Sequence, residues 1–333
     1  MNFEELAMTA ETVHIRPMNE NDLEESDKIM RLAFGTFLGL PEPILFMGDA
    51  GYVSTRYKAD PSAALVAITH DSRIVGSNFA LDWGSVGIFG PLTVHPNYWD
   101  KGVARELLRE TIKIFQRWGS KHLGLFTFAQ SSKHVHLYQK FDFWPRYLTA
   151  IMSRNIVEKR PEGQLSTRKP YFSTYSGLSQ AEKARIVTEC KRLTNGIYEG
   201  LDLRKEITSV DQQKIGDTIL LRDPNSEELL GFAVCHTGAG SEAGSGNCYV
   251  KFGAVRRGDN SPQLFNELLD ASDDYASSQN ISRVVAGVNM ARHGAYKSMI
   301  GRGFRTDMQG VTMHRPNEPG YNFPDIYLID DWR

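Results

Sequence analysis

The chain has few of the features that mark secreted, membrane-spanning or metal-dependent proteins. Its 333 residues include only three cysteines, Cys190, Cys235 and Cys248, and these have no CxxC spacing. We therefore expect reduced structural thiols, as in a cytoplasmic protein. His134 and His136 stand two residues apart on an expected helix and would point in different directions, so we expect no bound metal. No apolar run approaches the roughly 20 residues that span a bilayer. The N-terminus, Met1-Asn-Phe-Glu-Glu, lacks the basic start of a signal peptide.

An excess of charge of one sign is also missing. The formal net charge is -2 at pH 7, which gives no long-range attraction to nucleic acid or anionic lipid. Neither GxGxxG nor a GxxxxGK motif followed by Ser or Thr stands at an expected strand-to-helix junction, which argues against a dinucleotide or a nucleoside triphosphate. We expect no nucleic-acid partner, no membrane partner and a cytoplasmic location.

The remaining composition predicts a globular protein with two domains. Hydrophobic residues make up 41% and charged residues 23% of the chain, and the length suffices for two hydrophobic cores. The stretch from Asn155 to Pro170 is polar and contains Pro161 and Gly163, as connections between domains often do. We predict an N-terminal domain over residues 12–154, a linker over 155–170 and a C-terminal domain over 171–333.

Hydrophobic periodicity predicts a similar order of elements in the two halves. In the first half, strands are expected at 13–17, 63–69, 73–80, 122–128 and 147–153, with a further strand ending at Val94, and helices are expected after residue 22, after residue 102 and at 131–141. In the second half, strands are expected at 217–222, 230–235, 249–255, 283–288 and 310–314, and helices at 178–193, 263–275 and 291–300. This order indicates two copies of one α/β unit.

The most informative stretch runs from Gly87 to Leu108. An apolar strand reaches Val94, breaks at His95-Pro96, crosses a short turn containing Gly102 and enters an amphipathic helix. The first turn of a helix has backbone N–H groups without helical acceptors and carries partial positive charge. Such a turn suits a pyrophosphate, so this stretch predicts a phosphate-bearing cofactor.

Two motifs in the first half, over about residues 12–154, resemble those of the GNAT superfamily of acyl-CoA-dependent N-acetyltransferases. The chain has Trp99-Asp-Lys-Gly-Val-Ala104 after Val94-His-Pro96, where that family has Gln/Arg-x-x-Gly-x-Gly/Ala after Val-x-Pro. It also has Ser131-Ser-Lys-His-Val-His-Leu-Tyr-Gln-Lys-Phe-Asp-Phe143, where the family has Asn-x-x-Ala-x-x-Leu-Tyr-Glu-Lys-x-Gly-Phe. The chain departs from these patterns at Trp99, Ser131 and Asp142.

The second half resembles a diverged copy of the same family. Asn289 and Tyr296 keep the spacing of the later motif, and Gly303-Phe304 follows them. The position of the phosphate loop reads Val255-Arg-Arg-Gly-Asp-Asn-Ser-Pro-Gln263, without the small-residue pattern. We expect this copy to bind CoA poorly or not at all.

The resemblance implies a fold and an activity. The fold would be α/β, with a mixed, mostly antiparallel GNAT-like sheet flanked by helices and present twice. The activity would be direct transfer of an acetyl group from acetyl-CoA to a primary amine, in a small molecule or a peptide, within a ternary complex. The second copy could shape the acceptor cleft or form a homodimer surface. The alternative, from another functional class, is a non-catalytic acyl-CoA sensor or interaction module.

The resemblance also implies the residues of the site. The pantetheine arm and the thioester carbonyl would be held by the backbone of Leu92, Thr93 and Val94. The diphosphate would be held by the N–H groups of Asp100, Lys101, Gly102, Val103, Ala104 and Arg105, with Ser131 as a further CoA contact. Tyr138 occupies the general-acid position, and a phenol with a pKa of about 10 can donate a proton to the departing thiolate. The general base is open between Asp82 and His95, either acting through water.

Each of these residues has a plainer structural interpretation. Gly102 could serve only a strand-to-helix turn, and Tyr138 could be a half-buried aromatic residue. Ser131 is equally well explained as the N-cap of a helix. Arg256 and Arg257 could meet a phosphate, although a solvated loop is the simpler explanation. No motif identifies the acceptor amine.

Overall fold

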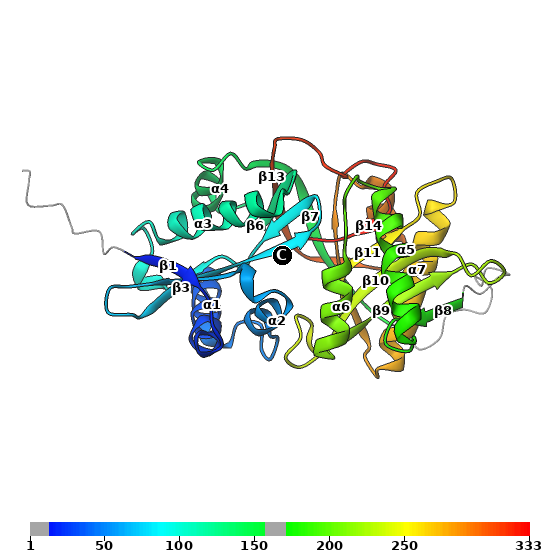
Figure 1. Ribbon diagram of the computed structural model, residues 1–333, viewed down its shortest axis with the longest axis horizontal. Coiled ribbons are helices and arrows are strands. Elements are labelled where there is room, and N and C mark those ends of the chain that lie inside the picture. The colour runs from blue at the N-terminus through cyan, green and yellow to red at the C-terminus, as the bar shows by residue number, and fades with distance from the viewer. Residues whose placement is uncertain (1–12, 157–170) are drawn as a thin grey trace, which may run out of the picture. The chain divides into compact units, whose positions relative to one another are not determined.

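The computed structural model describes residues 13–156 and 171–333 (Figure 1). These residues fold into two compact units. The first contains the described residues up to Gly48 together with Tyr52–Leu81 and Phe89–Trp118, and the second contains Asp49–Gly51, Asp82–Ile88 and Gly119–Arg333. Most of the expected linker, residues 157–170, lies outside the described residues. The domain boundaries expected from the sequence remain a prediction.

The first unit contains an antiparallel sheet with the order β1-β2-β3. Its strands are β1 (His14–Pro17), β2 (Ala64–Ile68) and β3 (Ile74–Trp83, whose last two residues fall in the second unit), with the short β5 (Thr93–Val94) paired to β3. The helices are α1 (Leu23–Phe37), α2 (Tyr52–Ala59) and α3 (Val103–Trp118), and the 3-10 turns are η1 (Glu20–Asp22), η2 (Pro43–Leu45), η3 (Pro61–Ala63) and η4 (Pro96–Tyr98).

Amphipathic character explains how α3 packs in this unit. Val103, Leu107, Leu108, Ile114 and Phe115 are all buried and recur at helical spacing. The helix packs against β1, β2 and β5. It therefore holds the turn that precedes Val103 close to the end of β5.

The strand expected to run to Val94 is divided in two. β4 (Val86–Phe89) ends before Gly90-Pro91, and β5 begins at Thr93. The amide of Gly90 donates to the carbonyl of Phe79 over 2.9 Å. Pro91 has no N–H group with which to continue a strand ladder, which explains the break.

The second unit contains a larger sheet with the order β4-β6-β13-β7-β12-β11-β10-β9-β8. Its strands after β4 are β6 (His122–Thr127), β7 (Trp144–Asn155), β8 (Tyr171–Thr174), β9 (Gly216–Arg222), β10 (Leu229–Gly238), β11 (Gly244–Val255), β12 (Arg283–Asn289), β13 (Arg305–Arg315) and β14 (Leu328–Ile329), which pairs with β11. Neighbours are antiparallel except for β4 with β6 and β11 with β12. The helices are α4 (Ser132–Gln139), α5 (Gln180–Asn195), α6 (Arg204–Gln213), α7 (Ser261–Ser278) and α8 (His293–Gly301).

The last long strands of the two sequence halves are exchanged within this sheet. β13, from the C-terminal half, lies between β6 and β7 and pairs with both (Figure 1). β7, the returning strand of the N-terminal half, pairs with β12 and β13. The expected N-terminal domain therefore completes its sheet with a strand from the other half of the chain.

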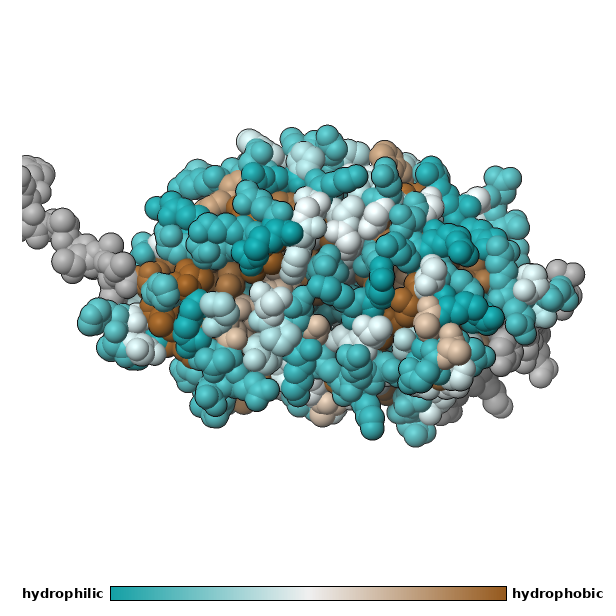
Figure 2. Space-filling view, viewed as in Figure 1, coloured by the Kyte–Doolittle hydropathy of each residue, from teal (hydrophilic) through white to brown (hydrophobic). Residues whose placement is uncertain are grey.

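The main core of this unit lies between the sheet and the helices α7 and α8. Fully buried apolar residues from β9, β10, β11 and β12 form one cluster with residues of α7 and α8. Cys235 and Cys248 lie in this cluster, and all three cysteines are free and buried. On the face that Figure 2 shows, hydrophilic side chains cover most of the surface. No helix in the described ranges is long and apolar enough to cross a bilayer.

Candidate functional site

The turn between β5 and α3 leaves consecutive backbone amides available. The amides of Arg105 and Glu106 donate to the carbonyl of Gly102 over 3.0 and 3.3 Å. Within the described part of the chain, the amides of Gly102, Val103 and Ala104 have no acceptor. These are the first N–H groups of the 16-residue helix α3. The turn therefore has the hydrogen-bonding capacity and the helix polarity that an anion requires.

Gly102 meets a conformational requirement at this turn. Its φ is +83°, and a Cβ atom built on it has no atom within 4 Å. A non-glycine residue would be strained there even though it would not clash. The space above the turn is open, which suits the approach of a ligand.

Trp99 stands where the family pattern has Gln or Arg, and its side chain forms a hydrogen bond with the end of β5. Its indole Nε1 donates to the carbonyl of Val94 over 2.7 Å. Lys101, which follows in the turn, places its ammonium group 4.7 Å from the ring centroid of Tyr98. The turn is therefore tied to the end of β5.

β5 is held on one edge by β3. Thr93 pairs with Ser77, Val94 pairs with Gly76, and the hydroxyl oxygens of Thr93 and Ser77 lie 3.1 Å apart. Thr93 and Val94 are buried, whereas Leu92 is partly exposed. In the described chain, β3 is the strand with which β5 pairs.

In the second unit, Ser131 and Tyr138 lie at the two ends of α4. Ser131 is the N-cap, and its hydroxyl accepts from the amide of His134 over 3.4 Å. Tyr138 is 7% exposed, and burial raises the pKa of its phenol. The hydroxyl is therefore protonated at neutral pH and remains able to donate a proton.

The two candidate bases are both engaged in hydrogen bonds. Asp82, in the second unit, accepts from the amide of Gly84 over 2.9 Å, and its other oxygen lies 3.0 Å from the ammonium group of Lys205. His95, in the first unit, uses its Nδ1 to accept from the amide of Asn97 over 3.2 Å. A histidine Nδ1 that accepts is unprotonated, so this ring is able to take a proton only by losing that bond.

The predicted site residues are thus divided between the two units. Residues 92–94 and 100–105 lie in the first unit, where Trp99 joins them. Asp82, Ser131 and Tyr138 lie in the second unit. The grouping around β5 and α3 follows from consecutive sequence positions, whereas the placement of Tyr138 depends on the fold.

Hydrogen bonds at a helix end identify the counterpart of Tyr138 in the second half. The amide of Phe143 donates to the carbonyl of Tyr138 over 3.1 Å, and the amide of Phe304 donates to the carbonyl of Met299 over 3.1 Å. The residues before these phenylalanines, Asp142 and Gly303, both have positive φ angles. Met299 therefore occupies the position equivalent to Tyr138. The sequence spacing, which pointed to Tyr296, misplaced the equivalence because α8 begins four residues after Asn289, whereas α4 begins one residue after Ser131.

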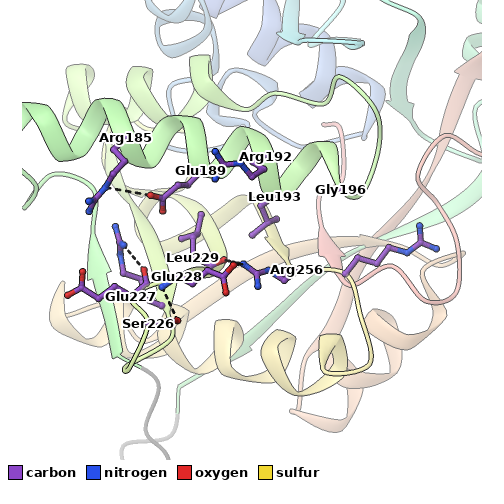
Figure 3. A pocket seen from close by; sticks show the side chains of 12 residues that line it. Arg185, Glu189, Arg192, Leu193, Gly196, Ser226, Glu227, Glu228, Leu229 and Arg256 are labelled. Carbon is purple, nitrogen blue, oxygen red and sulfur yellow. Dashed lines mark hydrogen bonds and ion pairs between the residues drawn. The ribbon is translucent and has the colours of Figure 1, made fainter.

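A charged cavity of about 600 Å³ lies in the second unit (Figure 3). Its lining residues are Arg185, Glu189, Arg192, Leu193, Gly196, Arg222, Ser226, Glu227, Glu228, Leu229, Arg256 and Arg257. Opposite charges pair across its wall. Arg256 contacts Glu228, and Arg185 lies 3.5 Å from Glu189. None of the predicted site residues lines this cavity.

Sequence reasoning missed two buried polar clusters in the second unit. Lys251 lies 3.1 Å from Glu206 and 2.9 Å from Glu242, and all three are less than one tenth exposed. The Nε2 of His122 lies 2.9 Å from the Nδ1 of His314, in rings that are also buried. Lys251 interrupts the apolar strand pattern at 249–255, and this could have indicated the lysine cluster from the sequence. The histidine pair could not be found in this way, because His122 and His314 lie far apart in sequence.

Desolvation governs the charge state of the histidine pair. Burial, followed by the charge of Arg146, lowers the pKa of His122 to about 4. Burial and the neighbouring His122 lower the pKa of His314 to about 3. Both rings are therefore neutral near neutral pH. Among the described residues, no group of three or more His, Cys, Asp or Glu side chains could hold a metal ion.

Comparisons with known proteins bear on the family of one segment and on the fold of the chain. Residues 36–143 match the model of the acetyltransferase (GNAT) family. No curated protein matches the chain. Three solved structures have the same fold. A proposed acetyltransferase from Pyrococcus horikoshii is 15% identical with a TM-score of 0.65, covering 98% of this chain and 96% of its own.

The other two structures cover the chain to a similar extent. A GCN5-related N-acetyltransferase from Sphaerobacter thermophilus is 14% identical with a TM-score of 0.59, covering 91% of this chain and 95% of its own. A tandem GNAT protein from the clavulanic acid biosynthesis pathway is 12% identical with a TM-score of 0.57, covering 91% of this chain and 98% of its own. The expected fold is confirmed: a mixed, mostly antiparallel GNAT-like sheet flanked by helices, present twice.

Proposed function

We propose, from the GNAT acetyltransferase domain at residues 36–143, that the protein transfers the acetyl group of acetyl-CoA to the nitrogen of a primary amine. The observation that carries the proposal is the turn at residues 100–105. It offers the unpaired amides of Gly102, Val103 and Ala104 at the start of α3. These amides would hold the diphosphate of the coenzyme, together with the neighbouring amides of Asp100, Lys101 and Arg105.

The thioester would lie along Leu92, Thr93 and Val94. Their backbone N–H groups would hold the pantetheine arm and donate to the thioester oxygen as negative charge develops on it. Ser131 would add a contact to the coenzyme, although its hydroxyl already caps α4. No metal is needed for this step.

The reaction balances with the residues named. The amine nitrogen attacks the carbonyl carbon, a C–N bond forms, and the C–S bond breaks with its electron pair going to sulfur. Tyr138 donates its proton to the departing thiolate, giving free CoA. Asp82 or His95 accepts the proton that the amine loses, through a water molecule. Burial raises the pKa of the Tyr138 phenol, so the proton is present at neutral pH and passes to the thiolate only as negative charge develops on sulfur.

The C-terminal half takes no part in the chemical step under this proposal. Its counterpart of Tyr138 is Met299, which has no proton to donate. We assign this half to shaping the acceptor cleft and to forming a homodimer surface, in a cytoplasmic protein. Its buried, free cysteines are compatible with a reducing compartment.

The test is turnover of acetyl-CoA with a panel of primary amines, measured as release of free thiol. The proposal predicts acetylation of at least one amine at the nitrogen, identified by mass spectrometry. Binding of acetyl-CoA without turnover on any amine would favour the alternative function, a non-catalytic acyl-CoA sensor.

A further inference from the structure

The C-terminal segment adds a strand to the second half of the protein. In β14, Leu328 pairs with Ala254 and Ile329 pairs with Gly253, in antiparallel register. β11 also pairs with β12, but only through its earlier residues Asn247–Val250. β14 therefore lies against β11 just beyond the point where the β11–β12 pairing ends.

The part of β11 that pairs with β14 is equivalent to residues 92–94 of the first half, along which the pantetheine arm is expected to lie. Gly76 pairs with Val94 in the first unit, and Gly231 pairs with Val255 in the second. One residue further on, the amide of His95 donates to Val75 and the amide of Arg256 donates to Leu230, over 2.9 and 2.8 Å. By this register Ala254 corresponds to Thr93 and Gly253 to Leu92.

The strand β14 of this segment is buried as deeply as the core. Leu328 and Ile329 are both fully buried. A Cβ atom built on Gly287 of β12 would lie 2.2 Å from the Cβ of Asp331, so only glycine permits so close an approach. The segment therefore packs against β12 as well as pairing with β11.

Polar contacts fix the segment along its length. Arg292, which is fully buried, donates to the carboxylate of Asp330 over 2.6 Å and to its backbone carbonyl over 3.0 Å. The hydroxyl of Tyr249 donates to Asp331 over 3.0 Å. Arg257, in the loop that corresponds to the phosphate loop, lies 2.8 Å from Asp325. Arg292 and Arg257 therefore both bind acidic residues of the C-terminal segment.

We propose that the edge of β11 at Gly253 and Ala254 is a peptide-binding site, and that its ligand is residues 321–333 of this chain, which pair with this edge through Leu328 and Ile329. The main chain of β11 is saturated by β14, the apolar side chains of Leu328 and Ile329 fill the core, and the two carboxylates at 330 and 331 give the site its preference for an acidic C-terminal peptide. The site excludes a pantetheine arm, because the arm would need the same main-chain groups. This exclusion rests on the proposed function, whereas the peptide binding does not.

The test is binding in trans. The chain ending at Gly320 is purified, and a synthetic peptide of residues 321–333 is added. We expect 1:1 binding by calorimetry and a higher unfolding temperature of the truncated chain. A peptide carrying Leu328→Asp should bind at least tenfold more weakly, because it buries a charge where the leucine is fully buried.

The matched control is a peptide carrying Phe323→Ser. Phe323 is 43% exposed, so this peptide should bind as well as the unmodified one. A folded truncated chain that does not bind the peptide would overturn the proposal. Equal binding of the Leu328→Asp peptide would overturn it too.

If the truncated chain does not fold, hydrogen exchange on the unmodified protein tests whether residues 321–333 occupy the peptide-binding site. The amides of Leu328 and Ile329 should exchange as slowly as those of the central strand residues Ala233 and Val234, and saturating acetyl-CoA should leave them unchanged. Rapid exchange of the segment, or a tenfold acceleration when acetyl-CoA is added, would overturn the proposal. Absence of any acetyl-CoA binding would count against the proposed function and leave the peptide site intact.

Discussion

The indole nitrogen of Trp99 lies 2.7 Å from the carbonyl oxygen of Val94 and donates a hydrogen bond to it. This bond closes the turn between the end of β5 and the start of α3. The donor is the indole Nε1 of Trp99, the residue that replaces the Gln or Arg of the family pattern. Under the proposed function, Trp99 would affect coenzyme binding by fixing the turn that carries the amides of Gly102, Val103 and Ala104.

Trp99→Phe should raise the KM for acetyl-CoA several-fold with little change in kcat. The substitution keeps an aromatic ring but removes the donor to Val94, a loss of about 1 kcal/mol for a hydrogen bond of this kind. Steady-state kinetics with varied acetyl-CoA measure the effect. Trp144→Phe is the matched control, since Trp144 is 39% exposed and its indole nitrogen donates to the nearby Asp142 over 2.8 Å. A large fall in kcat for Trp99→Phe would contradict a positioning role.

Gly102→Ala should weaken acetyl-CoA binding about tenfold and cost roughly 1 kcal/mol of stability, because Ala is strained at positive φ. Gly119→Ala is the matched control. Gly119 also has a positive φ, +69°, and open space around its Cβ position, but it lies at the other end of α3. Calorimetry and urea unfolding should therefore show a similar stability cost in both variants and a binding defect in Gly102→Ala alone. Equal affinities in the two variants would count against a coenzyme site at this turn.

Tyr138→Phe should lower kcat between about 100-fold and 10,000-fold, the range typical of removing a general acid. The dissociation constant for acetyl-CoA should not change, because the ring remains. Tyr296→Phe, in the second half, should retain full activity. The reverse pattern, with activity lost in Tyr296→Phe, would move the chemistry to the second half.

The stability of the protein should fall as the pH drops below about 6.5, the ordinary pKa of histidine. His122 and His314 have folded-state pKa values of about 4 and about 3, so the unfolded chain binds more protons in this window. The stability contributed by the neutral pair is complete above pH 6.5, is lost as the pH falls from 6.5 towards the folded pKa values, and falls no further below them. Each histidine adds a slope of at most about 1.4 kcal/mol per pH unit.

Urea unfolding between pH 7 and pH 4 measures this dependence. His122→Gln should flatten the profile, whereas a substitution of the exposed His70 should leave it unchanged. An identical profile for wild-type protein and His122→Gln would show that the buried pair does not control it.

Lys251→Met should destabilise the second unit by about 3–5 kcal/mol, because it removes the cation that balances two buried carboxylates, Glu206 and Glu242. Urea unfolding at neutral pH measures the loss. Lys28→Met is the control: its partner is the exposed Glu24, 2.7 Å away, and no measurable change is expected. Equal midpoints for the two variants would contradict the importance of the buried cluster.

The sequence predicts most helices and strands because their periodicity is strong. The amphipathic helix after Gly102 begins at Val103 and ends at Trp118, just before Gly119, as expected. The helices α2 and α6 were not predicted, and neither were the short strands β8 and β14. In α2 the apolar residues do not form a helical stripe, and the two residues of β14 are too few to show a period.

The exchange of β7 and β13 could not be predicted from periodicity. Apolar patterning identifies a strand and its buried face, but it does not select the partner. Both strands carry buried residues near their centres, such as Ala150 and Val311, and either would fit beside β6. The equivalence of Met299 and Tyr138 was missed because the connection before α8 is three residues longer than the one before α4. The hydrogen bonds that end each helix reveal it.

The most direct measurement of the central claim is hydrogen exchange of the peptide covering residues 99–106, with and without saturating acetyl-CoA. If the coenzyme binds at this turn, the amides of Gly102, Val103 and Ala104 should exchange at least tenfold more slowly when it is present. Unchanged exchange at these three amides, with acetyl-CoA bound elsewhere or not at all, would contradict the claim.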